Sequence, residues 1–190
     1  MEPRHLPNLI SLLRILLVVP SLWLLLRQRY DATLALVVVA ALSDGLDGFL
    51  ARRYGWSSRL GGILDPLADK LLLIGLFLVL GWLGELPWWL VLLALGRDLL
   101  IMGGALAYHL LIAPLQAQPL LISKCNTLLQ MLLVLSVLVH HALLPLPPAL
   151  RVALELATAV TLVWSGAAYV ILWGRRALII AGGRERHDER

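Results

Sequence analysis

The sequence has a single cysteine, Cys125, so no disulfide bond can form within the chain. A lone cysteine in an apolar segment is typical of a small core residue. No motif of a nucleic-acid-binding protein is present. The first apolar run, Ile10 to Leu26, lacks the small-x-small cleavage site of a signal peptide. Further runs of the same kind follow it, and we therefore interpret it as a first transmembrane helix.

The chain is rich in apolar residues. Its 190 residues are 60% hydrophobic, and the mean hydropathy is +0.86, well above the values of soluble domains. Apolar runs of membrane-spanning length follow one another, which predicts a single all-α integral membrane domain over residues 1–190. In a membrane protein, a formal charge of +4 bears on the orientation of the chain in the membrane and on its contact with anionic lipid.

About six spans are expected, because each run is near the ~20 residues that a bilayer requires and lipid forbids unpaired backbone. Proline and glycine mark most of the breaks between them. The expected helices are Leu9–Leu26, Ala32–Arg53, Leu60–Leu83, Trp88–Leu110, Leu120–His141 and Leu150–Trp173, followed by a solvated tail at 174–190.

Basic residues predict the orientation. Arg4, Arg52, Arg53, Arg59, Lys124 and the arginines after 174 fall on one side, against Arg27, Arg29 and Arg151 on the other. The excess of positive charge faces the cytoplasm in membrane proteins. Both termini, and any site near Arg52, are therefore expected on the cytoplasmic side.

Four aspartates interrupt this apolar pattern: Asp44, Asp47, Asp65 and Asp69. They flank the turn around Trp56 at nearly equal distances, so a helical hairpin would place them at similar depths, the inner pair on the order of 10–15 Å below the turn. Spacings of i,i+3 and i,i+4 put each pair on one helix face. If the two faces meet, four carboxylates converge.

Such a cluster is unfavourable without compensation. One aspartate at a helix centre costs roughly 2.5–3.5 kcal/mol, and neighbouring carboxylates raise one another's pKa. Hard divalent cations such as Mg²⁺ or Mn²⁺ relieve both problems, and two metals sharing acidic ligands recur in phosphoryl chemistry. Gly45, Gly48, Gly61 and Gly62 surround the acids, and Ala51 extends this small surface. Small residues allow close helix approach, and Arg52 could meet a diphosphate.

The pattern D-x2-D-G-x2-A-R-x8-G-x3-D-x3-D is filled at every position, by Asp44, Asp47, Gly48, Ala51, Arg52, Gly61, Asp65 and Asp69. It resembles the signature of the CDP-alcohol phosphatidyltransferase family. The resemblance implies a six-helix enzyme of the cell inner membrane, with CDP-diacylglycerol as donor and CMP as the released product. A homodimer is a further expectation that the resemblance carries.

The resemblance also implies roles for these residues. Asp44, Asp47 and Asp65 would be the main ligands of two divalent cations, and Asp69 would complete the metal site and act as general base. Gly48, Ala51 and Arg52 would line the CDP pocket, and Gly61 would allow close helix approach. Asn8 on the first span is a further candidate for nucleotide contact; an anchor at the membrane interface is about as plausible.

The acceptor alcohol is less clearly indicated. The segment "PNLISLLR" resembles both phosphatidylglycerophosphate synthases and cardiolipin synthases of the family, and "LALGRD" and "LISKCNTLLQ" are more similar to the CMP-forming cardiolipin synthases. We therefore favour phosphatidylglycerol as acceptor over glycerol 3-phosphate. Both carry a phosphate, which Arg97 and Lys124 would bind; alternatively, Arg97 and Asp98 form a structural pair. A divalent-cation transporter is the non-enzymatic alternative, although no ionisable residue continues a path through Ala32–Ser43.

Overall fold

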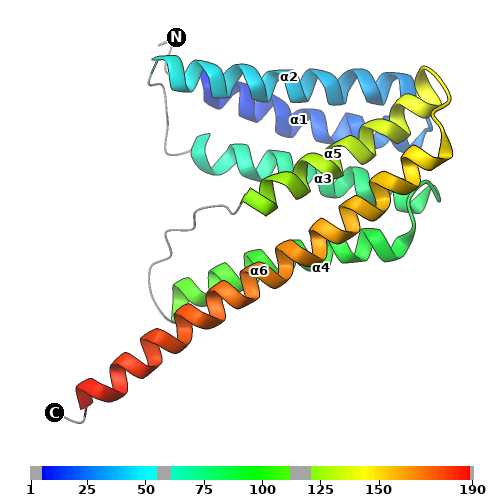
Figure 1. Ribbon diagram of the computed structural model, residues 1–190. Coiled ribbons are helices and arrows are strands. Elements are labelled where there is room, and N and C mark those ends of the chain that lie inside the picture. The colour runs from blue at the N-terminus through cyan, green and yellow to red at the C-terminus, as the bar shows by residue number, and fades with distance from the viewer. Residues whose placement is uncertain (1–5, 55–60, 112–120, 189–190) are drawn as a thin grey trace. The chain divides into compact units, whose positions relative to one another are not determined.

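The computed structural model describes the backbone of residues 6–54, 61–111 and 121–188, and the side chains of residues 13–43, 70–105, 121–172 and 174. Every element in these ranges is a helix (Figure 1). The helices are α1 (Leu6–Leu26), α2 (Tyr30–Tyr54), α3 (Gly61–Trp82), α4 (Trp88–Leu111), α5 (Leu121–Ala142) and α6 (Pro148–Asp188).

The expected helices are confirmed as helices. In the first five, the largest difference at an end is between the predicted Leu9 and the observed Leu6. The sixth differs more, because α6 continues to Asp188 through the segment expected to be a solvated tail. That segment contains no proline, and its alanine, leucine, glutamate and arginine residues are good helix formers, which outweigh the cost of its three glycines.

Three helices are long and apolar enough to cross a membrane within the described residues: Trp88–Ala105, Leu121–Ala142 and Pro148–Leu172. The apolar stretches described in the first three helices are shorter: Leu13–Leu26, Tyr30–Ser43 and Lys70–Trp82. Large apolar side chains are exposed on all six helices, among them Val19, Val38, Trp82, Leu99, Leu128 and Val160. An apolar surface of this extent is typical of a protein that contacts lipid.

The chain divides into two compact units, and each is considered by itself. The first unit contains Met1–Pro87 and Met131–Arg151, and the second contains Trp88–Gln130 and Val152–Arg190. The boundaries therefore fall between α3 and α4, within α5 and near the start of α6.

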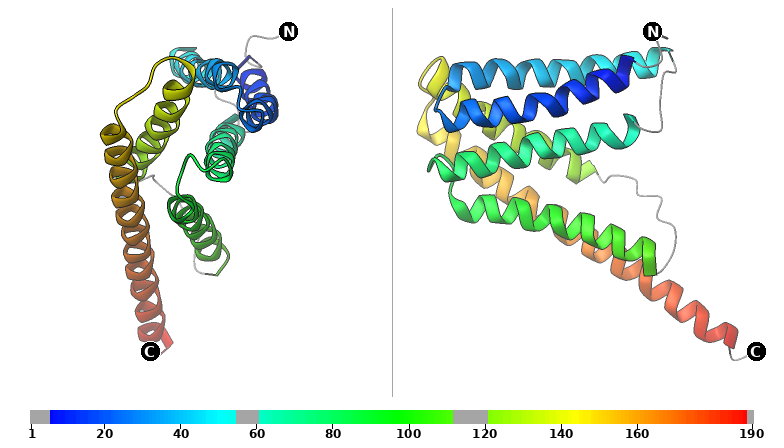
Figure 2. Two further views of the ribbon diagram at one scale, coloured as in Figure 1. Left: turned by 90° about the vertical axis from the view of Figure 1, so that its right-hand side faces the viewer. Right: turned by 180° about the vertical axis from the view of Figure 1, so that it is seen from behind.

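In the first unit, α1 lies between α2 and α3 and packs against both (Figures 1 and 2). Close approach of α1 and α3 depends on Gly75. A Cβ atom at this position would lie 2.6 Å from Cδ1 and 3.3 Å from Cγ of Leu22. Small residues at helix contacts are common in membrane proteins, where van der Waals packing drives association.

The turns after α1 and α3 are built in the same way. Gly84 has φ of 77°, its N–H donates to the Gly81 carbonyl, and the Glu85 N–H donates to the Leu80 carbonyl at 2.9 Å. This is the Schellman arrangement, which satisfies the last carbonyl groups of a helix and favours glycine at the left-handed position. After α1, Gln28 takes that position with φ of 56°.

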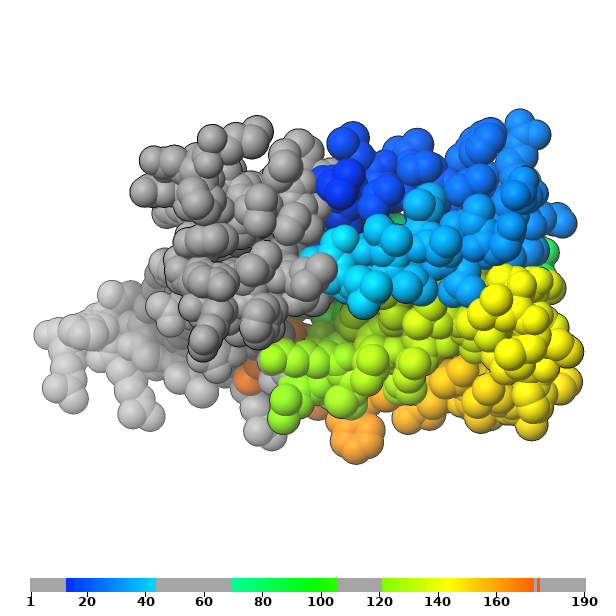
Figure 3. Space-filling model, turned by 90° about the horizontal axis from the view of Figure 1, so that it is seen from above, coloured from blue at the N-terminus to red at the C-terminus, as the bar shows by residue number. Residues whose placement is uncertain are grey.

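The end of the first unit at which these turns lie is held by Glu85. Its carboxylate oxygens are 3.0 Å from Nε2 of His141 and 3.1 Å from Nη1 of Arg151. The His141 ring stacks on Tyr30 with ring centroids 4.4 Å apart. Figure 3 shows the blue α1–α2 connection beside the yellow α5–α6 connection at this end. The Glu85 carboxylate thus links the start of α6 to the end of α5. The end of α5 also contacts the start of α2, through His141 and Tyr30.

Gly75→Val tests the contact between α1 and α3. The new methyl groups would have to displace Leu22, and overpacking of this kind costs about 1–3 kcal/mol. The matched control is Gly96→Val in α4, where a Cβ atom would meet nothing within 4 Å. Thermal unfolding in detergent should show a clearly lower midpoint for Gly75→Val than for Gly96→Val. Equal midpoints would mean that Leu22 moves aside at no cost.

Candidate active site

The acidic motif lies on α2 and α3. Asp44 and Asp47 fall within α2 at i,i+3, and Asp65 and Asp69 fall within α3 at i,i+4. The end of α2 and the beginning of α3 lie at the same end of the first unit (Figure 1), as expected for consecutive antiparallel helices. The helical backbone therefore supports a shared face within each pair.

The side chains of the motif lie outside the described residues. This holds for the four aspartates, for Gly48, Ala51, Arg52 and Gly61, and for Asn8 on α1. Their roles as metal ligands, general base and CDP-binding residues remain predictions. Among the residues whose side chains are described, no three His, Cys, Asp or Glu residues gather into a metal site.

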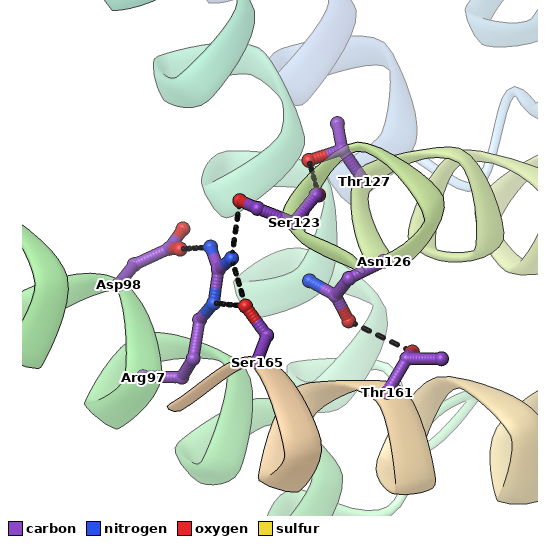
Figure 4. A network of polar contacts seen from close by, with 7 residues as sticks. All are labelled: Arg97, Asp98, Ser123, Asn126, Thr127, Thr161 and Ser165. Carbon is purple, nitrogen blue, oxygen red and sulfur yellow. Dashed lines mark hydrogen bonds and ion pairs between the residues drawn. The ribbon is translucent and has the colours of Figure 1, made fainter. Parts of the chain in front are cut away.

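Arg97, proposed as an acceptor ligand, lies in the interior of the second unit. It is 6% exposed, and its partner Asp98 is 7% exposed. Nη1 donates to Oδ1 of Asp98 at 2.6 Å, Nε donates to Oγ of Ser165 at 3.2 Å, and Nη2 donates to the same Oγ at 2.6 Å. Nη2 also donates to Oγ of Ser123 at 2.5 Å (Figure 4). The ion pair between Arg97 and Asp98 is thus present, and α4, α5 and α6 all contribute to one network.

A second polar contact lies next to this network. Oγ1 of Thr161 on α6 donates to Oδ1 of Asn126 on α5 at 3.1 Å (Figure 4). Asn126 is fully buried, and its Nδ2 has no hydrogen-bond partner among the described residues. The same is true of Oγ1 of Thr158, one turn from Thr161. Buried polar groups without partners cost about 1–3 kcal/mol each.

Together these contacts form a polar seam between α5 and α6. Ser123 and Ser165 meet at Arg97, and Asn126 and Thr161 meet one turn further along both antiparallel helices. The next positions in the same series are Gln130 and Thr158, both buried. Polar side chains that hydrogen-bond across helices stabilise membrane proteins, by about 0.6 kcal/mol on average and up to about 1.7.

Lys124, the other predicted acceptor ligand, is exposed. It follows Ser123 directly, so the structure brings its backbone beside the residue that accepts a hydrogen bond from Arg97. The two predicted acceptor ligands therefore belong to the same unit, one inside it and the other on its surface.

The sequence reasoning missed Ser123, Ser165, Asn126 and Thr161. A signal was present, because Ser123, Asn126 and Gln130 recur at helical spacing, as do Thr158, Thr161 and Ser165. A polar stripe along an otherwise apolar helix indicates a buried contact with another helix. The stripe alone does not indicate which other polar group each residue meets.

A family model described as CDP-alcohol phosphatidyltransferase matches residues 4–172. The match covers most of the chain, and the protein belongs to this family. The resemblance inferred from the aspartate pattern is thereby confirmed.

The relatives that match this chain include proteins named as two different enzymes of the family. A protein of Streptomyces coelicolor named cardiolipin synthase (CMP-forming) is 40% identical over 111 residues, which are 54% of this chain and 52% of the relative. A CDP-diacylglycerol–glycerol-3-phosphate 3-phosphatidyltransferase of Aquifex aeolicus is 40% identical over 139 residues, 70% of this chain and 75% of the relative. A rat cardiolipin synthase (CMP-forming) is 33% identical over 149 residues, 70% of this chain and 49% of the relative. The chain thus spans about half the length of the first and last of these.

Two threonines one turn apart on α6 test the polar seam. Thr161→Val removes the hydrogen bond to Asn126 and leaves another buried polar atom unpaired, so we expect a loss of about 1 kcal/mol in unfolding free energy. Thr158→Val replaces a buried hydroxyl that has no described partner with a methyl group, so stability should be unchanged or higher. Denaturant unfolding of the two variants in one detergent measures the difference. A similar loss in both would show that the hydroxyl of Thr158 does have a partner.

Proposed function

We propose that this protein is a phospholipid-synthesising enzyme of the cell inner membrane. It transfers the phosphatidyl group of CDP-diacylglycerol to the hydroxyl of a glycerol-type acceptor and releases CMP. The observation that carries the proposal is the complete acidic pattern on two consecutive helices, α2 and α3, in a chain that belongs to the CDP-alcohol phosphatidyltransferase family.

The donor set of the motif fits divalent cations. Carboxylate oxygens are the ligands that Mg²⁺ and Mn²⁺ prefer, and four carboxylates among apolar helices require positive charge nearby. Asp44, Asp47 and Asp65 would hold two such ions, with Asp69 completing the set. When bound, the cations neutralise the diphosphate and stabilise the departing CMP.

The residues of the motif have separate roles in binding CDP and in proton transfer. Arg52 binds the diphosphate through charge-assisted hydrogen bonds. Gly48 and Ala51 would line the CDP pocket with Arg52, Gly61 would allow close helix approach, and Asn8 on α1 would contact the nucleotide. Asp69 accepts the proton of the acceptor hydroxyl. The acceptor oxygen then forms a bond to the phosphorus of the phosphatidyl group as the bond from that phosphorus to the CMP oxygen breaks.

The proposed topology has six spans with both termini in the cytoplasm. Three helices are long enough as described. The helical backbones of α1, α2 and α3 continue beyond the residues whose side chains are described, and in α2 and α3 these further turns contain the acidic motif. Odd-numbered helices then enter the membrane from the cytoplasm, and the end of α2 that carries Asp44 and Asp47 faces the cytoplasm with the beginning of α3. A homodimer is compatible with this topology.

For the acceptor we favour phosphatidylglycerol, which would give cardiolipin; glycerol 3-phosphate, giving phosphatidylglycerophosphate, is the alternative. Relatives of both names match the chain at similar identity. The acceptor phosphate would bind at Arg97 and Lys124. An acceptor panel with CDP-diacylglycerol, in which the lipid products are identified, tests the choice.

Metal removal tests the acidic site. In the presence of a chelator, CMP release from CDP-diacylglycerol should stop, and it should return when Mg²⁺ or Mn²⁺ is added in excess, because carboxylates alone repel a diphosphate. Asp44→Asn and Asp65→Asn should each abolish CMP release in a folded protein. Asp31→Asn is the matched control, since Asp31 is an exposed aspartate at the start of the same helix as Asp44.

Two outcomes would contradict the proposal. Full turnover in chelator, or turnover by either variant at the level of Asp31→Asn, would remove the two-metal site. Mn²⁺ flux into liposomes in the absence of CMP release would instead favour the cation transporter.

Lys124→Ala tests the acceptor site. Loss of one charge-assisted contact to the acceptor phosphate should raise the KM for the acceptor roughly tenfold, at about 1.4 kcal/mol per decade. The KM for CDP-diacylglycerol should remain unchanged. Arg29→Ala, which removes an exposed cation from the α1–α2 connection, is the control. If Lys124→Ala and Arg29→Ala have the same acceptor KM, the acceptor phosphate binds elsewhere.

A further inference from the structure

The partners of Arg97 differ in their burial. Ser165 is fully buried, and Asp98 is 7% exposed, so both hold the guanidinium from the interior of the unit. Ser123 is only partly buried, and it precedes the exposed Lys124 on α5. The guanidinium is therefore held by α6 and Asp98 through buried contacts, and its Nη2 also donates to Ser123, the least buried of its partners.

The interior contacts fix the plane of the guanidinium by themselves. The single hydroxyl of Ser165 accepts hydrogen bonds from both Nε and Nη2, which holds one whole edge of a planar and rigid group. Asp98 holds Nη1 on the other side at 2.6 Å. The stem of the side chain rests on the next residue of α6, since a Cβ atom at Gly166 would lie 3.8 Å from Cγ of Arg97. The hydrogen bond to Ser123 is not needed for this orientation.

We infer that Ser165 is a positioning residue, which orients Arg97 so that its Nη2 edge binds the acceptor phosphate, and that Ser123 occupies this edge until the phosphate replaces it. The inference rests on the acceptor site proposed above. A phosphate oxygen is a stronger acceptor for a guanidinium N–H than a neutral hydroxyl, so the exchange is favourable. Without acceptor, Asp98 neutralises the buried charge and Ser123 completes the hydrogen bonds, so the empty site does not leave a buried cation unpaired.

Replacing each of the two serines by alanine should therefore change the KM for the acceptor in opposite directions. Ser165→Ala frees the guanidinium to rotate, and the KM for the acceptor should rise roughly threefold or more, about half of a lost charge-assisted contact on the logarithmic scale. Ser123→Ala removes the competitor for Nη2, and the acceptor KM should fall. Ser165→Thr, which restores a hydroxyl, should recover most of the loss. A purely structural role in packing would shift both serine variants in the same direction.

The experiment uses the full chain in nanodiscs, with phosphatidylglycerol and glycerol 3-phosphate as separate acceptors. The KM for each acceptor, the KM for CDP-diacylglycerol and the unfolding midpoint are measured for every variant. Ser136→Ala is the matched control, because Ser136 is a partly buried serine of α5 that donates only to its own helix, at the carbonyl of Leu133. Where Ser165→Ala does not accumulate as folded protein, Ser165→Cys, which is a much weaker acceptor of hydrogen bonds, takes its place.

The outcomes separate this inference from the proposed acceptor site. A raised acceptor KM in Ser165→Ala, a lowered one in Ser123→Ala and an unchanged KM for CDP-diacylglycerol support it. A rise in both serine variants, or an unchanged acceptor KM in Ser165→Ala, overturns it. Arg97→Lys and Lys124→Ala report on the site itself. If both leave the acceptor KM unchanged, the proposed acceptor site fails; if both raise it and Ser165→Ala does not, only the positioning role fails.

Discussion

The structure depends on one constraint: lipid offers no hydrogen bond, so a polar atom inside the membrane must find its partner within the protein. In the part of the chain that the structure describes, the helices satisfy the backbone in this way. At the end of α3, the Schellman turn at Gly84 satisfies the last carbonyl groups and brings Glu85 out of the helix, where its two oxygens meet His141 and Arg151. The same requirement governs the interior, where the polar groups of α5 and α6 face one another.

Charged residues meet this constraint in two ways. Arg97 is satisfied locally, by the carboxylate of the next residue and by two serine hydroxyls from other helices. A buried ion pair of this kind contributes little to the free energy of unfolding. Its main effect is to fix the position of the guanidinium. For the four aspartates of α2 and α3, we predict that bound cations rather than neighbouring side chains supply the positive charge. A polar group that is only satisfied by a ligand is typical of a functional site.

The sequence predicted the helices well because their physical cause is local. Apolar runs separated by proline and glycine determine where a membrane helix begins and ends, and the observed ends of α2 to α5 lie close to the expected ones. The helical extension of α6 was not predicted, because the sixth span was bounded by its apolar run and the segment after Trp173 was expected only to be a solvated tail. The predicted pair of Arg97 with Asp98 is present, being adjacent in sequence. Its contacts with Ser123 and Ser165 were not predictable in the same way, because they depend on how helices far apart in the chain are aligned. The side-chain geometry of the aspartates remains a prediction from spacing.

Charge at the acceptor site bears on which alcohol the enzyme uses. Arg97, Asp98 and Lys124 together carry a formal charge of +1, because the carboxylate cancels one of the two cations. Phosphatidylglycerol has a phosphodiester with one negative charge, which this site neutralises. Glycerol 3-phosphate has a phosphomonoester, whose second pKa near 6 gives it a charge close to −2 at neutral pH, and one negative charge would remain uncompensated. If the acceptor phosphate binds at Arg97 and Lys124 as proposed, this charge balance supports our preference for phosphatidylglycerol over glycerol 3-phosphate as the acceptor.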